Sequence, residues 1–102
     1  MKREQFEDVL VAGGWEKDRF GHYQKTERKR IPHVDHPDGI IRVSRYRVKF
    51  QKLSCRFEVQ TVFPATGYSP EKKGWTSLSS DYYSRVVLLP NGRVRVGNFL
   101  LP

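Results

Sequence analysis

A chain of 102 residues is long enough for one domain with a single modest core and too short for two. Its 37% hydrophobic and 13% aromatic content argues against disorder, and its formal net charge of +8 makes an anionic partner the first hypothesis. No apolar run approaches the roughly 18 residues that span a bilayer, the acidic N-terminus is unlike a signal peptide, and the single cysteine, Cys55, excludes an internal disulfide. We therefore expect a cytoplasmic protein without a membrane partner.

The first predicted element is a helix over residues 3–12, REQFEDVLVA. Phe6, Val9 and Leu10 recur at helical spacing, and acidic residues near the N-terminal end suit the helix dipole. Gly13 and Gly14 are expected to end the helix. One apolar face results, and it needs a sheet to pack against.

A strand is predicted over residues 15–26, WEKDRFGHYQKT, because apolar and polar residues alternate roughly. Phe20 and Tyr23 are an odd number of positions apart, so a regular strand would point them to opposite faces. Gly21 between them is interpreted as a β-bulge that resets the register.

Residues 14–25 also carry a family resemblance. Gly14, Trp15, Gly21 and His22 stand in an order similar to the start of HicA-type toxins, in which a Gly-Trp pair is followed by a Gly-Ser-His segment; here the serine is missing and the spacing is one residue shorter. Those toxins are small RNA-cleaving proteins that end in a helix, whereas this chain ends in an Asn-Gly hairpin pattern. The resemblance implies an RNA-cleaving enzyme with His22 as general acid or base, and a strand histidine without a chemical role is the alternative.

An exposed loop is predicted over residues 27–39, ERKRIPHVDHPDG, which combine charge, two prolines and a glycine. His33, Asp35 and His36 are potential metal donors within it. A metal site needs three or four ligands that converge on one ion at about 2.0–2.2 Å, and a proline-flanked loop offers no scaffold for that geometry. We interpret the segment as an ordinary polar loop and predict no metal ligand and no cofactor.

The strongest pattern is a β-hairpin within residues 44–61. If Phe50 faces Cys55 across a tight connection, the same register brings apolar residues together on one face. The resulting pairs on that face are Val48 with Phe57, Tyr46 with Val59, and Ser44 with Thr61.

The other face of this hairpin is basic. Lys49 would lie beside Arg56, and like charges directly opposite each other cost up to about 1 kcal/mol in a sheet. A phosphate backbone between the cations removes that repulsion, and the planar fork of arginine binds two phosphate oxygens. The sequence therefore predicts non-catalytic binding of RNA or DNA through phosphate contacts, with a merely solvated face as the alternative. The predicted nucleic-acid-binding residues are Arg45, Arg47, Lys49, Lys52 and Arg56, with Lys17 and Arg19 as contributors if the preceding strand lies alongside.

No long element is predicted over residues 64–81, where Ser69 is expected to cap a short helical turn begun by Pro70 and Glu71. Tyr68 and Trp75 make this segment a candidate cover for a sheet.

A second hairpin is predicted over residues 82–101, around a type I′ turn at Asn91-Gly92. Its register would pair Leu89 with Val94 and make both faces apolar. Either it lies at the centre of the sheet with both faces covered, or one face is a subunit contact. Protein–protein interaction or homo-oligomerisation through residues 82–101 is therefore the second functional hypothesis.

Together these elements predict a single α+β domain over residues 1–102. An N-terminal helix packs on a twisted, mainly antiparallel sheet of about five strands, which can curl towards a barrel. The residues predicted to join the helix to the sheet are Phe6, Val9, Leu10, Tyr46, Val48, Phe57 and Val59.

Overall fold

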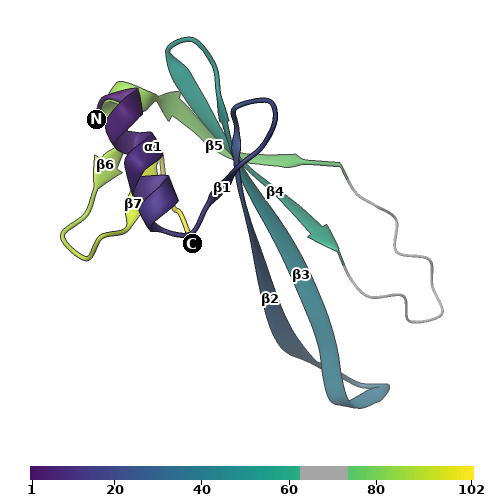
Figure 1. Cartoon of the computed structure of the whole chain (residues 1–102). Helices are drawn as coiled ribbons and strands as arrows, with labels where there is room; N and C mark the ends of the chain where they lie inside the picture. Colours follow the sequence, from purple (N-terminus) through teal and green to yellow (C-terminus); the bar gives the residue numbers. More distant parts are fainter. Residues whose placement is uncertain (63–73) are drawn as a thin grey trace.

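The computed structural model describes residues 1–62 and 74–102, which form an α+β fold. The predicted helical turn at residues 69–71 and the cover by Tyr68 lie outside this described part of the chain. A five-stranded antiparallel sheet has the order β1-β2-β3-β4-β5, and a three-stranded antiparallel sheet has the order β6-β7-β8 (Figure 1). The elements are α1 (Arg3–Ala12), β1 (Glu16–Lys17), β2 (Tyr23–His33), β3 (His36–Phe50), β4 (Ser54–Val62), β5 (Thr76–Tyr82), the 3-10 helix η1 (Tyr83–Arg85), β6 (Val87–Leu88), β7 (Val94–Val96) and β8 (Phe99–Leu100).

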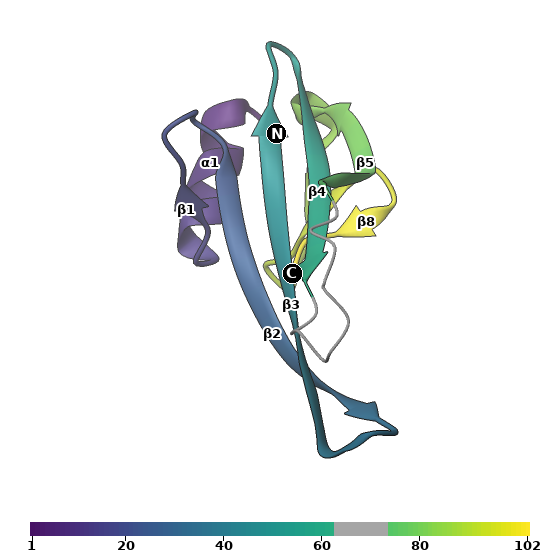
Figure 2. The same ribbon diagram turned by 90° about the vertical axis from the view of Figure 1, so that its right-hand side faces the viewer.

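Helix α1 and the three-stranded sheet lie on the same face of the five-stranded sheet, called here the inner face (Figures 1 and 2). No described helix or strand covers the opposite, outer face. The core therefore forms between the inner face, α1 and β7. Its buried members are Phe6, Leu10, Trp15, Tyr23, Val48, Phe50, Cys55, Phe57, Val86, Val94, Val96 and Leu101.

The predicted helix is confirmed with its bounds. Its first turn is closed by the Gln5 side chain, whose Oε1 accepts a hydrogen bond from the backbone N–H of Lys2 at 3.1 Å. Phe6 and Leu10 are buried, and the Phe6 ring meets the edge of the Phe50 ring at 5.4 Å between centroids. Val9 is half-buried at the border of the core. As predicted, the helix packs on the sheet through this apolar face.

The predicted register of β3 against β4 is also confirmed, from Phe50 opposite Cys55 along the pair. Val48 and Phe57 are fully buried, and the half-buried Tyr46 ring stacks on Phe57 at 5.6 Å. Burial, assisted by the charge of nearby Asp81, raises the pKa of the Cys55 thiol to about 11. Cys55 is therefore a core residue that stays protonated at neutral pH.

The single strand predicted over residues 15–26 is wrong, because a turn divides it into β1 and the start of β2. The Asp18 carboxylate accepts hydrogen bonds from the backbone N–H groups of Phe20 (2.8 Å) and His22 (3.0 Å) and from the Gln24 amide (3.1 Å). Gly21, with φ of 81°, lies in this turn and not in a bulge. The Asp18 carboxylate thus accepts hydrogen bonds from backbone N–H groups and favours a turn over a continuous strand.

The exposed loop predicted over residues 27–39 is wrong as well. β2 and β3 remain paired from Tyr23 opposite Val48 to His33 opposite His36, with one register shift after Ile31. Among the described residues β4 meets β3 only as far as Val43, so beyond that point the described hairpin is two strands wide. Both strands there are edge strands, which tolerate the proline in each. Residues 28–33 and 36–42 form this projection, called here the arm (Figures 1 and 2).

The predicted C-terminal hairpin is replaced by three short strands. Among the described residues between Leu89 and Arg93 only Gly92 has a positive φ, so the turn is not type I′. Gly92 donates its N–H to the Leu89 carbonyl (2.9 Å), which closes a three-residue loop that starts at Pro90. Leu88 consequently pairs with Val94, one position away from the predicted register.

A second reversal, at Gly97, sends β8 back along β7. Gly97 lies so close to β5 that an added Cβ would meet the Ser79 Oγ, which itself donates a hydrogen bond to the Val96 carbonyl (2.8 Å). The strand beside β4 is therefore β5, within the segment predicted to hold no long element, and not the C-terminal hairpin. Because β1 and β5 are the edges of the described sheet, curling towards a barrel stays a prediction.

We expect replacement of Asp18 with alanine to destabilise the β1–β2 turn by about 1 kcal/mol, since three partly solvent-exposed hydrogen bonds are lost. Partial burial raises the pKa of Asp18, but the bonds from His22, Gln24 and Phe20 outweigh it and hold the pKa below 3.8. The ionised carboxylate therefore stabilises the fold fully at pH values above the ordinary pKa of 3.8. This stabilisation is lost as the pH falls through the lowered pKa of the folded protein.

Urea unfolding of the wild type and Asp18→Ala at neutral pH and in acid measures this difference. Asp18→Asn is the matched control, because it keeps the Oδ1 acceptor without the charge and should lose less. A difference between wild type and Asp18→Ala that does not shrink in acid would contradict the role of the carboxylate charge.

Candidate nucleic-acid interface

The outer face of the five-stranded sheet carries most of the cations that the register brings together. Side chains alternate between faces along a strand, so alternate residues of β2, β3 and β4 share the outer face. In a β-strand, neighbours of this kind are about 7 Å apart. The cations of this row are Arg28 and Arg30 on β2, Arg45, Arg47 and Lys49 on β3, and Arg56 on β4.

Four of the predicted binding residues lie on this face, but they differ in exposure and in their contacts. Arg45 and Arg56 are exposed, and Lys49 is half-buried directly opposite Arg56. Lys52 lies apart, exposed in the turn between β3 and β4, at the end of the sheet away from the arm. The two arginines and Lys49 are therefore the predicted residues best placed for a shared ligand.

Arg47 is held by the protein itself. Its Nη2 and Nε lie 2.9 and 3.0 Å from the same Oε1 of Glu58, whose side chain is only 8% exposed. The indole of Trp75 stacks on the Arg47 guanidinium at 4.2 Å from the ring centroid. The charge of Arg47 is thus neutralised and covered, and this residue is part of the framework of the outer face.

The two contributors proposed from the preceding strand do not join the row. Lys17 pairs with Tyr23, which places it on the inner face, where its Nζ lies 3.9 Å from the Glu7 carboxylate. Arg19 lies in the β1–β2 turn with its guanidinium over the Phe20 ring.

Arg28 and Arg30, which were predicted to lie in an exposed loop, extend the row along the arm. Both are exposed, and Arg30 donates a hydrogen bond to the Asp38 carbonyl across the hairpin. The signal that could have found them is the pairing of Ile31 with Ile40, two apolar residues placed symmetrically about the tip. The other five cations of the row are called here the basic face: Arg28, Arg30, Arg45 and Arg56, which are exposed, and Lys49, which is half-buried.

His22, the residue that the toxin resemblance singles out, has a structural contact. Its Nδ1 accepts a hydrogen bond from the backbone N–H of Phe50 (3.2 Å), which ties the β1–β2 turn to the end of β3. At the tip of the arm, the rings of His33 and His36 lie 5.1 Å apart, and His33 Nδ1 accepts from the Asp35 backbone N–H (3.1 Å). Within residues 1–62 and 74–102, no group of three or more potential metal ligands is present.

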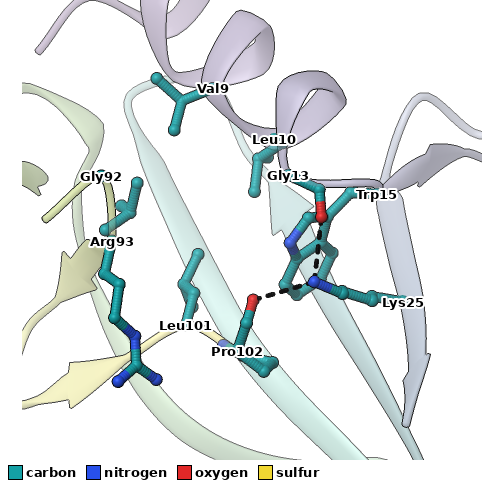
Figure 3. A pocket seen from close by; sticks show the side chains of 10 residues that line it. Val9, Leu10, Gly13, Trp15, Lys25, Gly92, Arg93, Leu101 and Pro102 are labelled. Carbon is teal, nitrogen blue, oxygen red and sulfur yellow. Dashed lines mark hydrogen bonds between the residues drawn. The ribbon is translucent and has the colours of Figure 1, made fainter.

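A small pocket of about 100 Å³ lies between the end of α1, β2 and the C-terminal strands (Figure 3). Two charged residues, Lys25 and Arg93, are among those that line it, and the Lys25 Nζ donates hydrogen bonds to the carbonyls of Gly13 (2.9 Å) and Pro102 (3.3 Å). Ligand pockets in proteins are usually about 300–1,000 Å³. Lys25 is thus engaged with the backbone and joins three elements of the fold at this pocket.

Comparison with models of known protein families finds no match, and neither do comparisons with curated proteins and with solved structures. The described part of the chain contains no helix that is long and apolar enough to cross a membrane.

We expect Arg47→Ala to lower the free energy of unfolding by about 2–4 kcal/mol, because it leaves the buried Glu58 carboxylate without its partner. Arg45→Ala is the matched control on the same strand, since Arg45 is exposed and contacts no carboxylate in the described residues; its effect should stay within about 0.5 kcal/mol. Urea unfolding followed by tryptophan fluorescence measures both. Equal stabilities of the two variants would show that the Arg47–Glu58 pair does not support the sheet.

Proposed function

We propose that the protein binds nucleic acid without catalysis, through phosphate contacts with the basic face. The observation that carries this proposal is the row of cations on the outer face, which no described helix or strand covers (Figure 2). On the described outer face of β1–β4 the carboxylates are Glu16, on the edge strand, and Glu58, which is bound to Arg47. The positive field of the row is therefore not cancelled by adjacent acids.

The close approach of like charges supports an anionic ligand. Lys49 and Arg56 are directly opposite each other, an arrangement that destabilises a sheet unless an anion lies between them. Phosphate oxygens suit this position, since arginine binds two of them with parallel hydrogen bonds. Binding of this kind releases counterions from the nucleic acid, so its affinity falls as salt rises and depends little on base sequence.

The framework of the outer face supports a non-catalytic role. Arg47 and Trp75 are engaged with each other and with Glu58, and His22 is engaged with the backbone of β3. The proposal also places the protein in the cytoplasm, where a single buried thiol such as Cys55 stays reduced.

Replacement of Arg45 and Arg56 by glutamine is expected to weaken binding at least about ten-fold at 0.1 M salt and to reduce the slope of log affinity against log salt by about 2. Fluorescence anisotropy with a labelled oligonucleotide measures both quantities. Arg47 is left unchanged, since its loss would disturb folding.

Arg93→Gln/Arg95→Gln is the matched control for this experiment. It removes the same charge from exposed positions next to β7 and within it, away from the outer face. Identical affinities and salt slopes for the two double variants would show that the basic face is not the binding surface.

A second candidate function is self-association through the C-terminal segment. Large hydrophobic side chains within residues 82–101 are well exposed, with exposed fractions between 37% and 55%. Exposed apolar side chains of this size occur in protein–protein contacts. Those of this segment are Tyr82, Val87, Leu88, Phe99 and Leu100.

If this surface joins two copies, gel filtration should show a dimer whose fraction rises with protein concentration, and Leu88→Ser/Phe99→Ser should shift it to the monomer. Ile41→Ser, which changes an exposed apolar residue on the arm, is the control and should leave the dimer unchanged. A monomer at every concentration would rule this candidate out.

A further inference from the structure

We propose that the arm inserts into the major groove of double-stranded DNA. This inference rests on the proposed nucleic-acid binding and names the form of nucleic acid that the shape of the protein fits. The features that carry it are the width of the arm, the charge on both of its faces and the side chains at its tip.

The dimensions of the arm match the groove. Beyond Val43 the described strands of the hairpin are two, β2 and β3, and six residues of β2, from Arg28 to His33, extend about 20 Å at strand geometry. The long axis of the molecule measures 47 Å, against 28 and 23 Å for the others, and the arm forms one end of it (Figure 2). The major groove of B-form DNA is about 12 Å wide and 8.5 Å deep, and it admits a two-stranded β-ribbon.

Cations stand on both faces of the arm. Arg28 and Arg30 lie on the outer face, whereas Lys29 and Arg42 lie directly opposite each other on the inner face. The buried Nε of Arg42 has no acceptor among the described residues. A phosphate backbone bound to the outer face alone would leave the inner-face cations, Lys29 and Arg42, without an anionic partner.

A groove has a phosphate backbone along each of its two walls. A ribbon that enters it meets anions on both sides, which neutralises the outer cations and the Lys29–Arg42 pair together. Basic residues on both faces of the arm are therefore the pattern that groove insertion requires.

The tip of the arm carries side chains suited to the groove floor. Val34 is fully exposed, and Val34 and Asp35 lie between His33 and His36 in the sequence. Thymine presents a methyl group in the major groove, and the other bases present hydrogen-bonding edges there. The major groove of an RNA duplex is deep and narrow, so the same arm would not reach its floor.

Lys29→Gln/Arg42→Gln tests this assignment, with Arg93→Gln/Arg95→Gln as the charge-matched control. The probes are a labelled DNA duplex of about two helical turns, its single strand and an RNA duplex of the same sequence, each at about 50 and 200 mM salt. We expect the wild type to bind the DNA duplex at least about ten-fold more tightly than the other probes, and the inner-face variant to lose this preference.

A label at the tip provides a second readout that does not depend on loss of charge. In Val34→Cys the new thiol is exposed, while Cys55 is 1% exposed and stays unlabelled. An environment-sensitive fluorophore at this position should respond to the DNA duplex and not to the RNA duplex.

The outcomes separate this inference from the function on which it rests. If no probe binds, the proposed function fails and the arm assignment fails with it. If Arg45→Gln/Arg56→Gln weakens binding while Lys29→Gln/Arg42→Gln matches its control, the basic face stands and groove insertion is overturned. Equal affinity for the RNA duplex, or a silent label at the tip, also overturns groove insertion.

Discussion

The register between β3 and β4 decides which side chains become core and which face solvent. Phe50 opposite Cys55 places Val48 and Phe57 in the core, and it places Arg45 and Arg56 on the outer face. Because side chains alternate along a strand, a shift of one residue would exchange the two sets completely. Burial of the aromatic core against α1 therefore also determines where the positive charge is displayed.

β3 connects the two halves of the molecule. At its C-terminal end it is flanked by β2 and β4 and covered by α1, whereas its N-terminal end has β2 as its single partner among the described strands. The arm thus continues a strand whose other end is fixed in the core. Anchored in this way, an exposed ribbon can hold its cations in a defined direction without a core of its own.

Among the described residues, the outer face contains one buried ion pair and several cations outside it, and the two have different physical roles. Glu58 is buried, so removal of Arg47 would leave an uncompensated charge, while Trp75 shields the pair from water. Arg45 and Arg56 lie next to this pair but remain exposed. Alternation in the sequence predicts the same outer face for Arg45, Arg47 and Arg56. They differ because the Glu58 carboxylate and the Trp75 indole contact Arg47.

Local patterns in the sequence were sufficient for α1 and for the β3–β4 pair, since helical spacing and strict alternation around a short turn need no distant partner. They also located Arg45, Lys49 and Arg56 on one face. Pairing with β3 decided the arm, because it brings Arg28 and Arg30 into a strand where local composition indicates a loop. Tertiary structure likewise decided the C-terminal strands, where the reversal at Gly97 depends on close contact with β5, a strand that lies far away in the sequence.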